Sequence, residues 1–231
     1  MSKEKVKPHF ISPVTNLKVG GVIQWGSDGI PIVHAQEVPT IDKYMEELEM
    51  KEQLKMKVLI KKVEEWAIEK GIHNADSRGQ FLKVVEEAGE IAEGVLTIWD
   101  EGKEKEGLEM VEDAIGDTFV TIIILAQQQG LKFEELFDNA EVSEQGAGEL
   151  TRLYQVIGEV SGALARDIKE GSNGGVEKPI TDMIPLLTNI AAGFEMTPSQ
   201  CLEVAYNVIS KRKGRTVNGV FIKEEDLKDG E

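Results

Sequence analysis

Carboxylates recur at helical spacing in two neighbouring stretches of the chain, and they are the residues best suited to chemistry. The first stretch, FLKVVEEAGEIAEG, contains Glu86, Glu87, Glu90 and Glu93. The second, EMVEDAIGDTFVTIIILA, contains Glu109, Asp113 and Asp117. Residues three or four apart share a face of a helix, so each stretch is expected to present a line of acids.

These acids have few basic neighbours. Lys83 is the only base between Gln80 and Asp100, although like charges four residues apart destabilise a helix. If the two helices pack antiparallel, four or five carboxylates converge. Hard divalent cations, which take oxygen ligands, would relieve that repulsion. Two acidic helices that simply face water are the alternative that spacing leaves open.

The pattern of acids resembles the MazG-like family of all-α nucleoside triphosphate pyrophosphohydrolases, whose signature is E-E-x-x-E followed by E-x-x-D on the next helix. Glu86, Glu87 and Glu90 match the first half of that signature. Asp117 matches the second half, but Ala114 stands where the family has its glutamate. The resemblance implies conversion of an NTP or dNTP to the monophosphate and pyrophosphate.

The resemblance also implies a set of metal ligands: Glu87, Glu90, Asp113 and Asp117. Asp113 lies four residues before Asp117 rather than three, so Asp113 and Glu86 are alternative fourth ligands. The expected cofactor is Mg²⁺, with Mn²⁺ as an alternative. A metal-polarised water would attack phosphorus, and Glu86 or Glu87 is the candidate catalytic base.

A basic cluster near the C-terminus is the candidate phosphate-binding region. Its bases stand out in so acidic a chain and could neutralise a triphosphate. By resemblance, the substrate-binding candidates are Asn207, Lys211, Arg212 and Arg215. The alternative is a helix end whose bases complement the helix dipole.

The elements that would position these residues follow from apolar periodicity and helix-ending glycines. We expect helices over about 41–70, 77–99 and 104–129, then a short one over FEELFDNA. In residues 1–40, GGVIQW and IPIVHA flank GSDG and predict a β-hairpin. The stretch KGRTVNGVF predicts a turn and a short strand that could pair with this hairpin.

After Glu141 the pattern of the first half recurs in weaker form. In that register Glu159 corresponds to Glu87 and Asp182 to Asp117, whereas Lys178 replaces Asp113. Pro185 is expected to interrupt the corresponding helix. Chance similarity between two helical hairpins is the alternative to a duplication.

We therefore expect an all-α, MazG-like helical bundle in which a tandem repeat forms an intrachain pseudo-dimer, with a small β-hairpin as N-terminal arm. The expected division is an extension over 1–40, a catalytic repeat over 41–141 and a degenerate repeat over 142–231. The tandem could satisfy the dimer interface internally, or two tandem chains could form a homodimer.

The composition limits the classes of partner and the cell compartment that we expect for this chain. A formal charge of −16 over 231 residues argues against nucleic-acid binding, which depends on neutralising phosphates. No run is apolar for long enough to span a membrane, and the N-terminus resembles no signal peptide. Cys201 is the only cysteine, which suits a reducing compartment. We expect a cytoplasmic protein whose Cys201 is a buried thiol.

Two other functions remain compatible with these residues. The chain could be a non-catalytic nucleotide-sensing or partner-binding module that lost turnover through Ala114. It could also be a purely structural bundle whose carboxylates stay in water. No P-loop is present, because the chain lacks GxxxxGK, so a P-loop NTPase is not expected.

Overall fold

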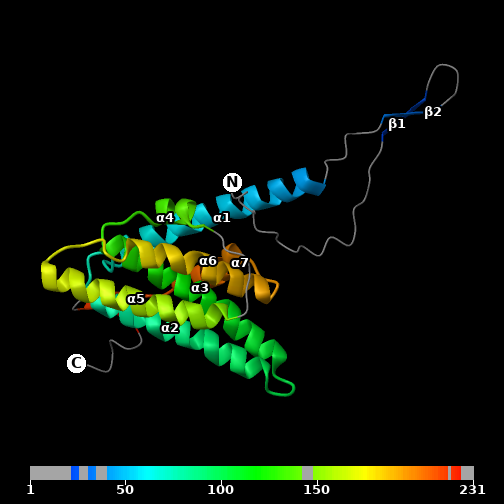
Figure 1. Cartoon of the computed structure of the whole chain (residues 1–231). Helices are drawn as coiled ribbons and strands as arrows, with labels where there is room; N and C mark the ends of the chain where they lie inside the picture. The colour runs from blue at the N-terminus through cyan, green and yellow to red at the C-terminus, as the bar shows by residue number, and fades with distance from the viewer. Residues whose placement is uncertain (1–21, 26–30, 35–40, 142–147, 218–219, 225–231) are drawn as a thin grey trace, which may run out of the picture.

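The body of the protein is a bundle of α-helices (Figure 1). The computed structural model describes residues 22–25, 31–34, 41–141, 148–217 and 220–224. The helices in these ranges are α1 (Ile41–Glu69), α2 (Ser77–Ile98), α3 (Glu104–Gln128), α4 (Phe133–Asn139), α5 (Glu149–Glu170), α6 (Glu177–Gly193) and α7 (Pro198–Ile209). The all-α core and the four expected helices of the first half are confirmed.

Local sequence signals set the helix boundaries. The Asp76 carboxylate caps α2, accepting a hydrogen bond from the Arg78 backbone amide at 2.9 Å. The Thr197 hydroxyl caps α7 in the same way, with Pro198 in the first turn. Gly71 follows α1 with a φ of +70°, a conformation that glycine adopts without strain.

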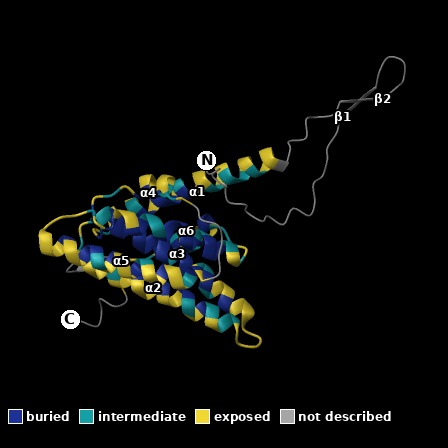
Figure 2. Ribbon diagram, viewed as in Figure 1, coloured by how far each residue is buried: buried dark blue, intermediate teal, exposed yellow. Residues whose placement is uncertain are grey.

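The centre of the bundle is the C-terminal half of α3, which is buried on every side (Figure 2). Its side chains from Thr118 to Ala126 are all buried, as expected for a helix that is apolar all round. Helix α2 packs along α3, and α1, α6 and α7 also contact it. This helix therefore holds the two halves of the chain together.

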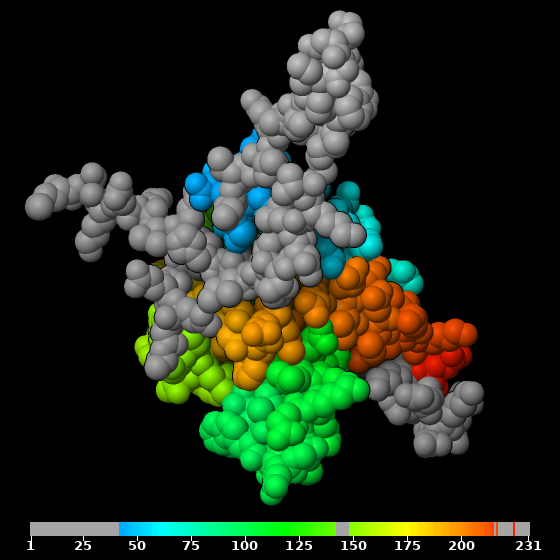
Figure 3. Space-filling model, turned by 90° about the vertical axis from the view of Figure 1, so that its right-hand side faces the viewer, coloured from blue at the N-terminus to red at the C-terminus, as the bar shows by residue number. Residues whose placement is uncertain are grey.

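Helices α2 and α3 approach very closely near the loop that joins them. A Cβ on Gly94 would lie 2.8 Å from Val111 Cγ2, and one on Gly107 would lie 2.6 Å from the Ile98 backbone nitrogen. Only glycine fits such contacts without displacing a neighbour. The tip of this hairpin, drawn in green, protrudes below the orange α6 and α7 in Figure 3.

Helix α7 is anchored at both ends. The Glu52 carboxylate of α1 accepts hydrogen bonds from the Ser199 amide at 2.7 Å and from its hydroxyl at 2.6 Å. These bonds satisfy amide groups that a helix N-terminus would otherwise leave unpaired. Further along, the Lys62 ammonium lies 5.5 Å from the Tyr206 ring centre, within the range of a cation–π contact.

The second half contains another pair of packed helices, α5 and α6. The loop between them is fastened by Asp167, whose carboxylate accepts from the Gly175 amide at 2.8 Å and from the Ser172 hydroxyl at 3.0 Å. Two longer helices followed by a short one thus occur twice along the chain. That order is compatible with the expected duplication and does not establish it.

Two sequence expectations are wrong. Helix α6 continues through Pro185 instead of breaking there. Buried apolar neighbours on either side of Pro185 offset the hydrogen bond that the ring removes. The C-terminal strands β3 (Gly214–Val217) and β4 (Val220–Lys223) pair with each other rather than with the N-terminal hairpin.

The N-terminal strands β1 (Val22–Trp25) and β2 (Pro31–His34) pair antiparallel where the hairpin is expected. The turn between them and the rest of residues 1–40 lie outside the described residues. Among the helices of the described ranges, none has both the length and the apolar character that crossing a bilayer requires.

Candidate functional site

The antiparallel pairing of α2 and α3 brings the two acidic lines together. Ile98 packs against Gly107, and one turn further along both helices Gly94 packs against Val111. One or two turns further on, Glu87 and Glu90 come beside the turn that holds Asp113 and Asp117. This register places acidic residues of both helices along the same part of the α2–α3 pair; that they converge on one metal ion stays a prediction.

Asp117 is the most perturbed acid in this group. Burial, together with the negative charges of Glu87, Asp113 and Glu90, raises the pKa of its carboxyl from an ordinary value of 3.8 to about 7. The positive charge of Arg212 acts in the opposite direction. A carboxyl group that is costly to ionise and surrounded by other acids is a frequent feature of functional sites.

Glu90 shares the same surroundings. Burial raises the pKa of its carboxyl, and Glu87, Glu86 and Asp113 add to that effect while Lys83 opposes it. Glu87 itself is only 8% exposed. The four expected metal ligands therefore interact electrostatically as one acidic cluster, which we define as Glu87, Glu90, Asp113 and Asp117.

Lys83 is the counter-ion of this cluster on α2. Its ammonium lies 2.6 Å from a Glu86 carboxylate oxygen and 3.1 Å from one of Glu87. Burial lowers the pKa of Lys83, but the two glutamates outweigh it and raise the pKa overall. One lysine thus binds both candidate catalytic bases. The spacing of three and four residues could have signalled this contact from the sequence.

Arg212 reaches the cluster because α7 packs closely against α3. A Cβ on Gly116 would lie 2.2 Å from the Cys201 carbonyl oxygen and 2.9 Å from the Ala205 side chain. Gly116 thus allows the two backbones to touch one residue before Asp117. Helix α7 ends at Ile209, and the residues that follow it place Arg212 near the acids.

The other expected substrate-binding residues are placed differently. Asn207 and Lys211 are exposed at the end of α7, and no contact of either with the acidic cluster is seen in the described part of the chain. Arg215 lies in β3, and its side chain is outside the description. Among Asn207, Lys211 and Arg212, whose side chains are described, Arg212 is the one whose charge acts on the acids.

The acidic cluster has suitable donors for a metal but no preformed set of ligands. Carboxylate oxygens are the ligands that Mg²⁺ and Mn²⁺ prefer, and the mutual repulsion at Asp117 would favour a cation. However, in the ranges that the structure describes, no three His, Cys, Asp or Glu side chains are close enough to hold one metal ion. Binding would require the side chains to converge, and Lys83 to release Glu87.

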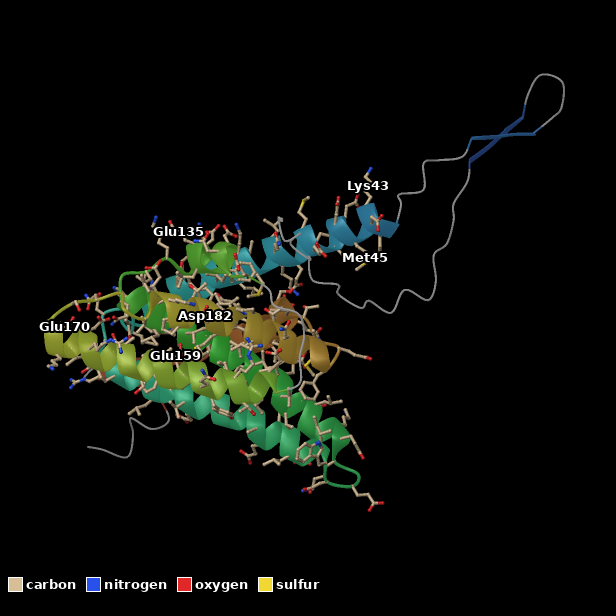
Figure 4. All side chains as sticks on the ribbon, in the orientation of Figure 1. Lys43, Met45, Glu135, Glu159, Glu170 and Asp182 are labelled. Atoms are coloured by element: carbon tan, nitrogen blue, oxygen red, sulfur yellow. The ribbon has the colours of Figure 1, made fainter. Side chains whose placement is uncertain are left out.

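The corresponding residues of the second half are already neutralised. The Lys178 ammonium binds an Asp182 carboxylate oxygen at 2.6 Å, and Glu159 also acts on the charge of Lys178. Figure 4 labels Glu159 on α5 and Asp182 on α6. Lys178 therefore supplies a positive charge beside Asp182 where the expected register has Asp113 beside Asp117.

A cavity of about 590 Å³ lies between the end of the first half and α6 of the second, and no residue of the acidic cluster lines it. Its lining comes from α4, the loop before α6 and the first turns of α6, and includes Asn139, Lys178 and Asp182. The Lys178–Asp182 ion pair occupies its wall. The cavity holds none of the expected site residues.

Sequence reasoning missed one contact that fixes α2 beside the acids. The Tyr154 hydroxyl of α5 donates a hydrogen bond to the Ala88 carbonyl at 2.7 Å, next to Glu87. A partly exposed tyrosine on an amphipathic helix carries no local signal for such a contact. Cys201 is buried as expected, and burial raises the pKa of its thiol to about 12, so it is not a nucleophile.

Comparison with known proteins adds little on function. No family model matches the chain, and no solved structure matches it. An uncharacterised 18.2 kDa protein from the rep-hol intergenic region of Haemophilus phage HP1 is 37% identical over 71 residues. The match covers 30% of this chain and 39% of the phage protein. It shows similarity to a phage protein and assigns no activity.

Proposed function

We propose that the protein is a metal-dependent nucleoside triphosphate pyrophosphohydrolase that converts an NTP or dNTP to the monophosphate and pyrophosphate. One observation supports the proposal: the part-buried Asp117 lies within electrostatic reach of acids from two antiparallel helices and of the positive charge of Arg212. The resemblance of Glu86, Glu87, Glu90 and Asp117 to the MazG-like signature gives this cluster its chemistry. Residues 142–231 would be the degenerate second copy of the tandem.

Glu87, Glu90, Asp113 and Asp117 would hold Mg²⁺. The bound ion would neutralise the triphosphate and polarise a water molecule. Arg212 would contact the phosphates, because a guanidinium pairs well with phosphate oxygens.

Lys83 has two roles in this proposal. Without metal it forms ion pairs with Glu86 and Glu87 on its own helix, which offsets part of their negative charge. With metal bound, Glu87 would serve as a ligand and Glu86 would keep Lys83 as its partner, which would leave Glu86 as the candidate general base.

The deciding experiment measures pyrophosphate release from the common NTPs and dNTPs with Mg²⁺ or Mn²⁺. We expect Asp117→Asn and Glu90→Gln to lower turnover by at least about 100-fold, because each removes a charged ligand. Glu109→Gln is the matched control on α3, since Glu109 is exposed and binds Lys105 at 3.4 Å. Equal turnover in all three variants would refute this site.

A non-catalytic nucleotide sensor is the second candidate, and one observation favours it. Glu86 and Glu87 are both bound by Lys83, and Ala114 removes one carboxylate of the family pattern. A sensor would bind a nucleoside triphosphate in a calorimeter and release no pyrophosphate at any metal concentration. Neither binding nor turnover would leave a structural bundle.

A further inference from the structure

Helix α2 carries an apolar stripe on the side that faces away from the bundle (Figure 2). Its residues follow the three-and-four spacing of a coiled-coil seam: Leu82, Val85, Gly89, Ala92, Leu96 and Trp99. Leu82 is 66%, Leu96 58% and Trp99 75% exposed. We call this set the α2 stripe. It is distinct from the core face of the same helix, where Val84, Ala88 and Ile91 are buried.

Single exposed apolar residues are ordinary, but four large ones in register along one helix and its C-cap are not: Leu82, Val85, Leu96 and Trp99. The middle of the stripe is open, because a Cβ on Gly89 would meet no atom within 4 Å. A partner helix that crosses at Gly89 could therefore approach closely there and pack its side chains against the large residues at both ends.

An acidic rim borders the stripe on one side. It consists of Glu86, Glu93 and Asp100, which follow the same seven-residue spacing one position after Val85, Ala92 and Trp99. Asp100 has Lys103 at 3.3 Å, and Glu86 has Lys83. Glu93 is exposed. A second copy of this chain would bring two such rims together and place Glu86 against Glu93 in an antiparallel pairing.

We propose that the α2 stripe binds a helix of a partner protein that has an apolar seam flanked by lysines or arginines. Apolar burial would supply most of the affinity, and the acidic rim would select the basic flank. This surface goes beyond the proposed enzymatic function and does not depend on it.

The test uses the full-length chain and two synthetic helical peptides of about 20 residues with leucine at every seam position. One peptide has lysine at the flanking positions and the other has glutamate. Binding is measured by calorimetry. We expect the lysine peptide to bind at least about tenfold more tightly than the glutamate peptide, with a difference that shrinks in high salt.

Two variants separate the apolar and the charged contributions. Leu96→Ser combined with Trp99→Ser should abolish binding, and Glu93→Lys should remove the preference for the lysine peptide. Leu54→Ser on α1 is the matched control, since Leu54 is 64% exposed and lies outside the stripe. Because the stripe residues are exposed, circular dichroism should show all variants equally folded.

Three results would overturn the proposal. Binding that survives Leu96→Ser with Trp99→Ser would place the peptide elsewhere. Equal affinity for both peptides would remove the charge argument. Light scattering that shows a dimer of the chain, dissociated by the same pair of substitutions, would assign the stripe to a second copy instead.

Discussion

Replacing Asp117 by asparagine should stabilise the folded protein at alkaline pH when no divalent cation is present. Burial and neighbouring acids raise the pKa of this carboxyl from 3.8 to about 7. A raised pKa means that the folded state binds the proton more tightly than the unfolded chain does. The wild-type protein therefore loses stability as pH rises from about 4 to about 7, and the loss is constant above that range.

The size of this effect follows from the shift. Each pKa unit corresponds to about 1.4 kcal/mol, so ionising Asp117 in the folded state costs at most about 4 kcal/mol. About two of the roughly three pKa units of this shift lie above pH 5. The stability of Asp117→Asn relative to wild type should therefore grow by about 2–3 kcal/mol between pH 5 and pH 8. The asparagine keeps the shape of the side chain and lacks the charge.

Urea unfolding followed by circular dichroism, in buffer with a chelator, measures this advantage at each pH. Glu109→Gln serves as the control, and its stability relative to wild type should not change with pH. Adding Mg²⁺ at pH 8 should stabilise the wild type more than Asp117→Asn, because only the wild type retains all four acids. An Asp117→Asn advantage that is the same at pH 5 and pH 8 would refute the charge-crowding argument.

Three further predictions concern the scaffold. Gly116→Ala should destabilise the fold by about 1–3 kcal/mol, because the added Cβ would collide with the Cys201 carbonyl. Gly158→Ala, at an open position in α5, should instead stabilise the fold by about 0.5–1 kcal/mol. Thermal unfolding of the two variants compares these effects. Asp167→Ala should cost about 1–3 kcal/mol by leaving the Gly175 amide unpaired, and hydrogen exchange at residues 171–176 should rise selectively. Glu195→Gly should raise the melting temperature, since Glu195 has a φ of +59° after α6 and glycine adopts that conformation without a steric penalty; an unchanged melting temperature would contradict this account.

The periodicity of apolar residues and the residues that end helices determine much of the local structure. The apolar spacing before Gly71 and the glycines around residue 102 predict the bounds of α1, α2 and α3 closely, because each signal acts within a few residues. Pro185 shows the limit of such signals. Its ring removes one hydrogen bond locally, and burial of the surrounding helix in the core outweighs that loss.

The candidate site was likewise predictable from the sequence only in part. Residue types and spacing predicted two acidic lines on neighbouring helices, and the resemblance to the MazG-like signature singled out Glu87, Glu90 and Asp117 within them. The sequence could not reveal that Gly116 lets α7 touch α3, or that Arg212 comes near enough for its charge to act on Asp117. Those relations join residues far apart in the chain, and only the tertiary packing of the helices determines them.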